Sequence, residues 1–219
     1  MVEARILSIQ VGKPRVFSSG GAAEAWTSGI FKERVGGPIH LGRENLWGDG
    51  QADLAHHGGP DRAVLIFSQS NYPVWEAFLG KPLVGGSFGE NLTVEPIDED
   101  EICIGDIWEA DEVVLEVSQP RLPCYKLSRR LDAEGFHLEL IETRAAGWYC
   151  RTLHEGDVEA GQTLRLLARP HPDWTIRRAF HEFVSVKDAP DSLRELGGLP
   201  ALSQLWKERI AVRVAKRPV

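Results

Sequence analysis

The chain has 219 residues, of which 42% are hydrophobic and 26% are charged, as in an ordinary globular protein with a sizeable core. Its formal net charge of −7 disfavours general nucleic-acid binding, which needs a basic face. No apolar run approaches the roughly 20 residues that span a bilayer, and no basic region leads into an apolar segment at the N-terminus. The three cysteines are widely spaced and form no C-x-x-C motif, which indicates a reducing compartment. We therefore expect a cytoplasmic protein with neither a nucleic-acid nor a membrane partner.

Apolar side chains alternate along residues 6–11, which predicts a first strand. The turn that follows carries two cations, one of them Lys13. It is either a solvated turn or an anion contact in which Lys13 acts as a point charge. Residues 20–37 are rich in glycine and predict a long loop or a loose hairpin, with hydroxyls and a further cation in residues 27–32.

Residues 48–62 combine glycines with two adjacent histidines. Neighbouring residues of an extended segment point in opposite directions, so the pair argues poorly for a metal site. A turn fits better, because Gly58 and Gly59 would let backbone N–H groups approach a ligand, while His57 and Arg62 add polar contacts. The alternative is a surface turn with an idle histidine.

Short elements separated by glycine and proline fill the rest of the first 169 residues. We predict strands at 63–67, 92–94, 102–108, 113–117, 147–153 and 162–167, and helices at 70–79 (capped by Ser70) and 131–145 (with Leu138, Ile141 and Ala145 on one face). Many short strands with few helices indicate a mainly β protein with an antiparallel barrel.

Small residues at 85–89 lead into the strand at 92–94 and leave Phe88, Glu90 and Asn91 near its beginning. Asparagine and glutamate can read the donor and acceptor edge of a heterocycle. They are also ordinary turn residues, so two interpretations remain open.

The most informative stretch follows the strand at 113–117. Pro120 and Pro123 each fix φ and restrict the residue before them, so the loop at 118–127 should hold Cys124 in a limited orientation. Arg121 and Lys126 are close to this cysteine in sequence. If they are also close in space, they would raise the thiolate fraction that attacks electrophiles or binds soft metals. The alternative is a small buried core residue.

A proline-bracketed boundary near residue 170 divides the chain into a barrel domain (1–169) and a small extension (170–219). The extension contains three amphipathic stretches that predict short helices, the third beginning at Pro200. Leu202, Leu205 and Trp206 form an apolar stripe on this third helix. The stripe either closes onto the barrel or makes a homodimer.

Seven motifs along the chain together resemble the pattern of a known protein family. The motifs that carry the resemblance are Val11-Gly12-Lys13-Pro14, Thr27-Ser28-Gly29-Ile30-Phe31-Lys32, Gly48-Asp49-Gly50-Gln51-Ala52-Asp53, His57-Gly58-Gly59-Pro60-Asp61-Arg62-Ala63, Phe88-Gly89-Glu90-Asn91-Leu92, Ile104-Gly105-Asp106 and Ser118-Gln119-Pro120-Arg121-Leu122-Pro123-Cys124-Tyr125-Lys126-Leu127. In this order they resemble a stand-alone bacterial MOSC domain, named for the C-terminal domain of molybdenum cofactor sulfurase. The nearest subgroup carries a three-helix C-terminal extension and reduces N-hydroxylated bases such as hydroxylaminopurine.

The resemblance implies a β-barrel that binds molybdenum cofactor, the Mo-molybdopterin group. Cys124 matches the cysteine that ligates molybdenum, a role that suits a soft thiolate donor. Lys13 matches the residue that contacts the cofactor phosphate. The other positions carried over as cofactor-binding are His57, Gly58, Gly59, Arg62, Phe88, Glu90, Asn91, Gln119 and Arg121.

The implied activity is reductive cleavage of the N–O bond of a small N-hydroxylated substrate. Cys124 and His57 are the expected catalytic residues, with His57 relaying protons because histidine titrates near neutrality. The sequence has no G-x-G-x-x-G fingerprint of a flavin or nicotinamide site, so we expect electrons to come from a separate reductase. Two other functions stay open: a carrier that holds cofactor or sulfur on Cys124 without turnover, and an interaction domain that binds no cofactor.

Overall fold

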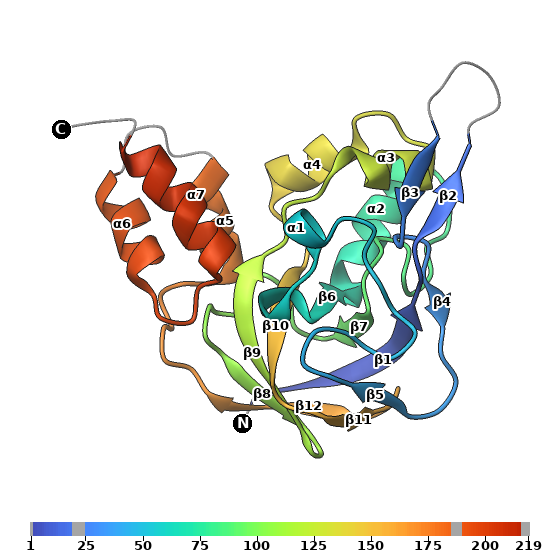
Figure 1. Cartoon of the computed structure of the whole chain (residues 1–219), viewed down its shortest axis with the longest axis horizontal. Helices are drawn as coiled ribbons and strands as arrows, with labels where there is room; N and C mark the ends of the chain where they lie inside the picture. Colours follow the sequence, from blue (N-terminus) through green and yellow to red (C-terminus); the bar gives the residue numbers. More distant parts are fainter. Residues whose placement is uncertain (1, 19–24, 185–189, 216–219) are drawn as a thin grey trace.

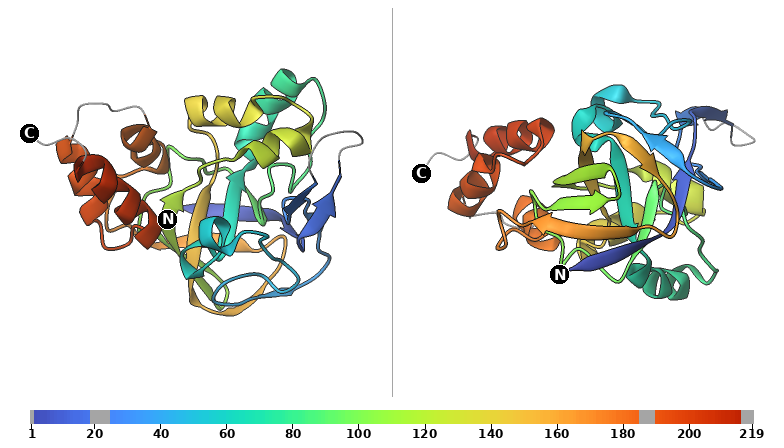
Figure 2. Two further views of the ribbon diagram at one scale, coloured as in Figure 1. Left: turned by 45° about the horizontal axis from the view of Figure 1, so that its top comes forward. Right: turned by 90° about the horizontal axis from the view of Figure 1, so that it is seen from below.

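The computed structural model describes residues 2–18, 25–184 and 190–215. Its main strands are β1 (Glu3–Val11), β4 (Glu33–Arg34), β6 (Val64–Ser68), β7 (Leu92–Glu95), β8 (Ile107–Ala110), β9 (Val113–Pro120), β10 (Trp148–His154) and β12 (Thr163–Ala168). Within this part of the chain they form one eight-stranded sheet in the order β12-β8-β9-β10-β6-β7-β1-β4. The sheet closes into a barrel because β12 also pairs with β1, and the mainly β fold is confirmed (Figures 1 and 2).

Two small ribbons are attached to the barrel. β2 (Arg15–Phe17) pairs with β3 (Trp26–Ser28), and β5 (Ile39–Leu41) pairs with β11 (Gly156–Val158). Of the β2–β3 ribbon only β3 lies in the glycine-rich segment 20–37, for which a long loop or a loose hairpin was predicted; β2 precedes that segment, and residues 19–24 lie outside the described residues. The β2–β3 ribbon leaves the barrel on the side away from the C-terminal helices (Figure 1).

The strand pattern follows from side-chain burial. β6 is buried at every position because it lies between β10 and a parallel neighbour, β7. Its continuous apolar sequence therefore contributes to the core on both faces. β1 is amphipathic at its beginning, where exposed and buried residues alternate.

The barrel helices are α1 (Leu54–His57), α2 (Tyr72–Leu79), α3 (Tyr125–Leu131) and α4 (Phe136–Thr143), with single 3₁₀ turns η1 (Pro60–Arg62) and η2 (Gln69–Asn71). The predicted helix at 131–145 is wrong in two respects. Asp132 and Gly135 have φ of 49° and 75°, so the chain turns there and separates α3 from α4. The buried side chains of α4 are Phe136 and Leu140, whereas Leu138 is exposed.

Two further boundaries differ from the prediction. Ser70 does not cap the helix at 70–79; the Ser68 hydroxyl instead accepts from the Ser70 backbone N–H and begins η2. Only the end of the predicted strand at 102–108 joins the sheet, as the beginning of β8. Its first half forms a turn in which the Cys103 N–H donates to the Asp106 carboxylate at 3.0 Å.

The extension forms three helices as predicted: α5 (Ile176–Val184), α6 (Pro190–Gly198) and α7 (Gln204–Ala215). α7 begins at Gln204 rather than at Pro200, because the Ser203 hydroxyl accepts from the Trp206 N–H and caps the helix there. The Trp206 side chain is fully buried, with its ring 4.5 Å from that of Phe183. Leu202 and Trp206 of the apolar stripe are thus buried within the chain, whereas Leu205 is partly exposed, and a homodimer stays a prediction.

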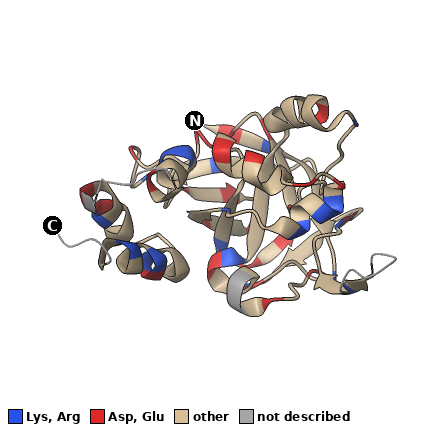
Figure 3. Ribbon diagram, turned by 90° about the horizontal axis from the view of Figure 1, so that it is seen from above, with Lys and Arg blue, Asp and Glu red and all other residues tan. Residues whose placement is uncertain are grey.

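The three helices lie together beside the barrel, where α5 packs against β9 (Figures 1 and 2). Basic and acidic residues occur on both the barrel and these helices (Figure 3). Of the helices in the described part of the chain, none has the length and apolar character needed to cross a membrane.

Candidate functional site

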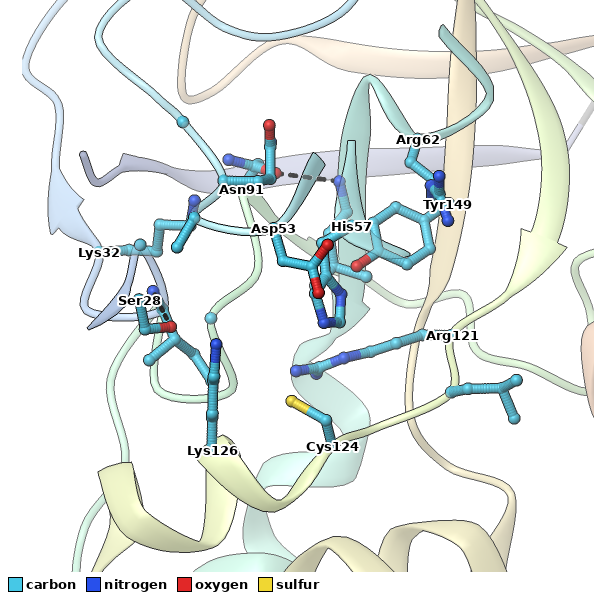
Figure 4. Close-up of a pocket in the computed structure, with 18 residues that line it drawn as sticks. Ser28, Lys32, Asp53, His57, Arg62, Asn91, Arg121, Cys124, Lys126 and Tyr149 are labelled. Carbon is cyan, nitrogen blue, oxygen red and sulfur yellow. Dashed lines mark hydrogen bonds between the residues drawn. The ribbon is translucent and has the colours of Figure 1, made fainter. Parts of the chain in front are cut away.

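Loops at one end of the barrel enclose a pocket around Cys124, which we call the inner pocket (Figure 4). Its polar lining consists of Ser28, Lys32, Gln51, Asp53, His57, Arg62, Asn91, Arg121, Cys124, Lys126 and Tyr149. These residues come from segments that are far apart in the sequence, including β3, the loop before α1, the loop after β9, and β10. The closed barrel brings them together.

Cys124 is fixed by the loop between β9 and α3. The Arg121 N–H donates to the Gly147 carbonyl at 3.0 Å, and the Cys124 carbonyl accepts from the Leu127 N–H at 3.0 Å as α3 begins. Cys124 is partly exposed, in contrast to Cys103 and Cys150, which are buried. Its sulfur points into the space between Lys126, Arg121 and His57, so the cations expected near the thiol are indeed there (Figure 4).

The base of the inner pocket is supported by a buried carboxylate that lies behind its lining, in contact with the lining residues Lys32 and Asn91. Asp49 has a fully buried side chain that accepts from the Gly12 N–H at 2.7 Å and from the Asn91 amide at 2.9 Å, and it pairs with the Lys32 ammonium. Burial lowers the pKa of Lys32, and the neighbouring Asp49 opposes that shift. One carboxylate thus ties together the end of β1, the segment before β4 and the start of β7.

Two glycines are required where loops meet beside this base. A Cβ on Gly29 would overlap the Gly50 carbonyl oxygen, and one on Gly12 would overlap the Phe31 carbonyl oxygen. Only glycine allows such close backbone approach. The glycine-rich motifs therefore bring the Ser28 and Gln51 segments into contact at the pocket wall.

The pocket carries a local excess of cations in a chain of net negative charge. Burial, with smaller contributions from Arg121 and other cations, lowers the pKa of His57 to about 4. This shift runs against the expectation that His57 titrates near neutrality, and it leaves the imidazole neutral at pH 7. Burial also raises the pKa of Tyr149, with Arg121 opposing the shift, so the phenol stays protonated.

Two residues that line the inner pocket each carry a buried polar atom without a hydrogen-bond partner among the described residues: Arg121 Nη1 and Gln51 Oε1. The Gln51 amide nitrogen is held by Asn45 at 2.5 Å, which fixes the side chain. Leaving a buried donor or acceptor unpaired costs about 1–3 kcal/mol. A ligand that offers an anionic oxygen to Arg121 and an N–H to Gln51 would recover this free energy.

A wider hollow of about 380 Å³ adjoins the inner pocket. We call it the outer cavity; seven of its lining residues also line the inner pocket, namely Asp53, His57, Arg62, Leu122, Cys124, Lys126 and Tyr149. Its separate walls are Gln119, Pro123 and Tyr125 from the β9–α3 region, and Leu205 and Arg209 from α7. Cys124 therefore lies where the two spaces meet.

The structure brings together part of the predicted site. His57, Arg62, Asn91, Arg121 and Cys124 line the inner pocket, and Gln119 lines the outer cavity. Asn91 mainly supports the site: its side-chain oxygen accepts from the Leu65 N–H and its nitrogen donates to Asp49.

Five predicted residues lie outside the lining of both spaces: Lys13, Gly58, Gly59, Phe88 and Glu90. Lys13 is exposed on the turn after β1. Phe88 is a core residue whose ring stacks on Phe67 at 4.1 Å. The buried Glu90 carboxylate accepts from the Tyr72 hydroxyl and from backbone N–H groups, so its bonds are made within the protein.

Several lining residues were not assigned to the site from sequence: Ser28, Lys32, Gln51, Asp53, Lys126 and Tyr149. The hydroxyls and cation at 27–32 were a usable signal, and Lys126 had been noted beside Cys124. Tyr149 could have been found from strand alternation, since its buried neighbours Trp148 and Cys150 face the core. Gln51 and Asp53 lie in the 48–62 segment that the sequence had singled out, but neither was assigned a role there.

Within the described residues there is no group of three or more His, Cys, Asp or Glu side chains that could hold a metal ion. A metal at Cys124 would thus need further ligands from a cofactor. The barrel carries a cation-rich pocket around a partly exposed cysteine, a setting whose chemistry suits an anionic small molecule beside a thiol.

Comparison with known proteins identifies the family. Residues 53–165 match the model of the MOSC domain, and the chain belongs to this family of proteins. It is 39% identical to YflK of Bacillus subtilis (strain 168), over 92% of this chain and 90% of that protein. A protein named "Reductase" from Gibberella moniliformis is 36% identical over 78% of this chain, which corresponds to 30% of that longer protein.

The solved structure of YiiM from Geobacillus stearothermophilus superposes with a TM-score of 0.82 at 30% identity, covering 96% of this chain and 99% of that one. These matches extend beyond the MOSC segment at both ends. They place the chain with the stand-alone bacterial MOSC proteins, as the sequence motifs predicted.

Proposed function

We propose that this protein is a molybdenum-cofactor-dependent reductase that cleaves the N–O bond of N-hydroxylated bases such as hydroxylaminopurine. The observation that carries the proposal is the position of Cys124. Its partly exposed thiol lies where an inner pocket with unpaired polar atoms meets an outer cavity of about 380 Å³. One space would take a resident group and the other a substrate.

The side chains of the inner pocket suit molybdenum cofactor, a pterin dithiolene with a phosphate, although the pocket, of about 80 Å³ in this structure, would have to widen to hold it. Cys124 would supply a soft thiolate donor for the metal. The unpaired Arg121 Nη1 would donate to an anionic or carbonyl oxygen, and Gln51 Oε1 would accept from a pterin N–H. Lys126 adds a further cation at the pocket wall.

When bound, the cofactor supplies the two-electron chemistry that the side chains lack. The overall change consumes two electrons and two protons, breaks the N–O bond, and releases an amine and water. Tyr149 keeps its proton because its pKa is raised, so its hydroxyl can donate a hydrogen bond to a substrate oxygen. His57 is neutral at pH 7 and can orient a substrate or a water by hydrogen bonding, rather than by carrying a proton.

The proposal includes a small-molecule N-hydroxylated substrate, a cytoplasmic location and a separate electron-donating reductase. The fungal relative named "Reductase" supports oxidoreductase chemistry in a chain of this family. It also shows a MOSC-type segment joined to a larger chain, since the match spans 30% of that protein.

The test is turnover of hydroxylaminopurine with an artificial electron donor, using protein purified from a host that makes molybdenum cofactor. We expect adenine to form with the wild type and not with Cys124→Ala. Cys103→Ser is the matched control, because Cys103 is buried away from both spaces. Cofactor bound without any turnover would indicate a carrier instead, and equal activity of Cys124→Ala would overturn the assignment.

A further inference from the structure

The outer cavity has a wall that lies beyond the matched MOSC segment. Residues 53–165 match the family model, whereas Leu205 and Arg209 belong to α7 in the C-terminal extension. These two residues are four apart on one helix and so lie on the same face. The extension therefore contributes directly to the space next to Cys124.

Hydrogen bonds hold α7 in this position. The Gln204 N–H donates to the Asp61 carboxylate at 2.9 Å, and the Ser203 N–H donates to the Ser118 carbonyl at 2.9 Å. Asp61 and Ser118 each precede a residue that lines the outer cavity. The start of α7 is thus anchored to the barrel next to the cavity, and buried Trp206 fixes its rotation.

Gln119, which lines the outer cavity, carries a buried acceptor that nothing in the described chain satisfies. Gln119 is 3% exposed, and its Oε1 has no hydrogen-bond partner there. Its amide nitrogen makes only a long bond of 3.4 Å to the Pro120 carbonyl. An N–H or O–H donor on a ligand would pair with Gln119 Oε1 and recover about 1–3 kcal/mol.

Two guanidinium groups meet at the same cavity. Arg62 reaches it from the barrel and donates to the Gly58 carbonyl at 2.8 Å, while Arg209 reaches it from α7. Burial is the first cause that lowers the pKa of Arg62, and the charge of Arg209 adds to the shift. Lys126 also lines the cavity, and Asp53 is the carboxylate facing these cations. Like charges held together favour an anionic ligand between them.

We propose that the outer cavity binds the substrate in a phosphorylated form, as an N-hydroxylated purine nucleotide. Arg209 contacts the phosphate, and Gln119 Oε1 accepts from an N–H or O–H of the base. The volume of about 380 Å³ falls in the range of roughly 300–1,000 Å³ typical of small-molecule sites. This inference rests on the proposed function for the chemistry, but the nucleotide site itself can be tested without it.

The first experiment measures binding to the full chain by isothermal titration calorimetry, with adenosine 5′-monophosphate and adenine as probes. Adenosine monophosphate is the product expected from the reduced nucleotide. We expect Arg209→Gln to weaken its binding about tenfold or more and to leave adenine binding within about twofold. Arg194→Gln, an exposed arginine of α6 outside both spaces, is the matched control. Equal losses for both probes, or no loss, would overturn the role of Arg209.

A second variant tests whether Gln119 Oε1 accepts a hydrogen bond from the ligand. Gln119→Leu removes an unsatisfied buried atom, so we expect the melting temperature to stay level or rise while both probes bind less tightly. A drop in melting temperature with unchanged binding would show that Gln119 serves only the fold and would overturn its assignment.

The last experiment uses protein loaded with cofactor and compares hydroxylaminopurine with its nucleoside 5′-monophosphate. We expect Arg209→Gln to lower kcat/KM for the monophosphate about tenfold, mainly through KM, and to retain molybdenum and pterin at the wild-type level. Loss of molybdenum and pterin in this variant would mean that Arg209 binds the cofactor and would overturn the proposal. Arginine-dependent nucleotide binding without any reduction would instead support the site and refute the proposed function.

Discussion

The inner pocket and the outer cavity meet at Cys124 but are built in different ways. The inner pocket lies among barrel loops and rests on buried Asp49, with glycines that allow close backbone contact. The outer cavity is wider and takes one wall from a helix of the C-terminal extension. The cation-rich lining of the inner pocket suits a resident anionic cofactor, and a cavity with an added wall allows substrate choice to change while the barrel stays the same.

The largest expected effect concerns the base of the inner pocket. Lys32→Met would leave the Asp49 carboxylate buried without its charged partner, and we expect the free energy of unfolding to fall by about 3–5 kcal/mol. Urea denaturation followed by circular dichroism measures this. Lys13→Met, at an exposed lysine nearby, should change it by less than about 0.5 kcal/mol. Equal effects of the two substitutions would show that Asp49 does not support the pocket in this way.

The rate of alkylation should distinguish Cys124, at the site, from Cys103 and Cys150, which lie in the core. Burial raises the pKa of Cys103 to about 11 and raises that of Cys150 further, so at pH 8 both are almost entirely thiols. We expect Cys124 to react with iodoacetamide at least about a hundredfold faster than either, because it alone of the three is partly exposed. Peptide mass spectrometry of the native protein gives the three rates. Comparable labelling of all three would contradict the described burial.

Substitution of Arg121 should reduce cofactor binding while changing the melting temperature little. Its Nη1 has no partner in the described chain, so Arg121→Gln removes little that the fold uses and should leave the melting temperature within a few degrees. We expect pterin retention to fall about tenfold, since a charge-assisted hydrogen bond is lost. Arg165→Gln, in an exposed pair with Glu3, is the control and should retain the pterin. Unchanged retention in Arg121→Gln would remove this residue from the cofactor site.

The smallest effect concerns pH. The pKa of His57 is about 4 in the folded chain and about 6.5 when unfolded, so between these values the unfolded chain binds more protons. This contribution to stability is present above pH 6.5 and is lost as the pH falls towards 4. In His57→Asn the decline in melting temperature over this window should be shallower. An NMR titration of the cofactor-free protein should give a His57 midpoint near 4, and a midpoint near 6.5 would contradict the burial.

Local patterns predicted most of the longer strands, the three C-terminal helices and the special position of Cys124, but not the short strands β2, β4, β5 and β11. They depend on nearby sequence: continuous apolar residues in β6, and two prolines around the cysteine. Closure of the barrel depends instead on pairing between β1 and β12, about 160 residues apart, with Glu3 opposite Arg165. No local pattern encodes such a pairing.

The same difference between local patterns and long-range pairing explains which site residues could be predicted. Cys124 and Arg121 follow one strand and could be found together, whereas Gln51 and Tyr149 reach the pocket only through tertiary structure. Phe88 and Glu90 occur in a glycine-rich motif that looks like a ligand loop. The structure uses them in the core, where Phe88 stacks on Phe67 and Glu90 binds Tyr72. A motif therefore marked the right region without identifying which side chains face the pocket.

The most direct test of the central claim is metal and pterin analysis of the protein from a host that makes molybdenum cofactor, with Cys124→Ser prepared in parallel. Elemental analysis gives molybdenum, and fluorescence of the oxidised pterin gives the organic part. We expect about one molybdenum and one pterin per wild-type chain, and loss of the metal in Cys124→Ser with the fold intact. A folded wild-type protein with neither component, or a variant that keeps its full molybdenum content, would contradict the account of Cys124 as the protein ligand of a bound cofactor.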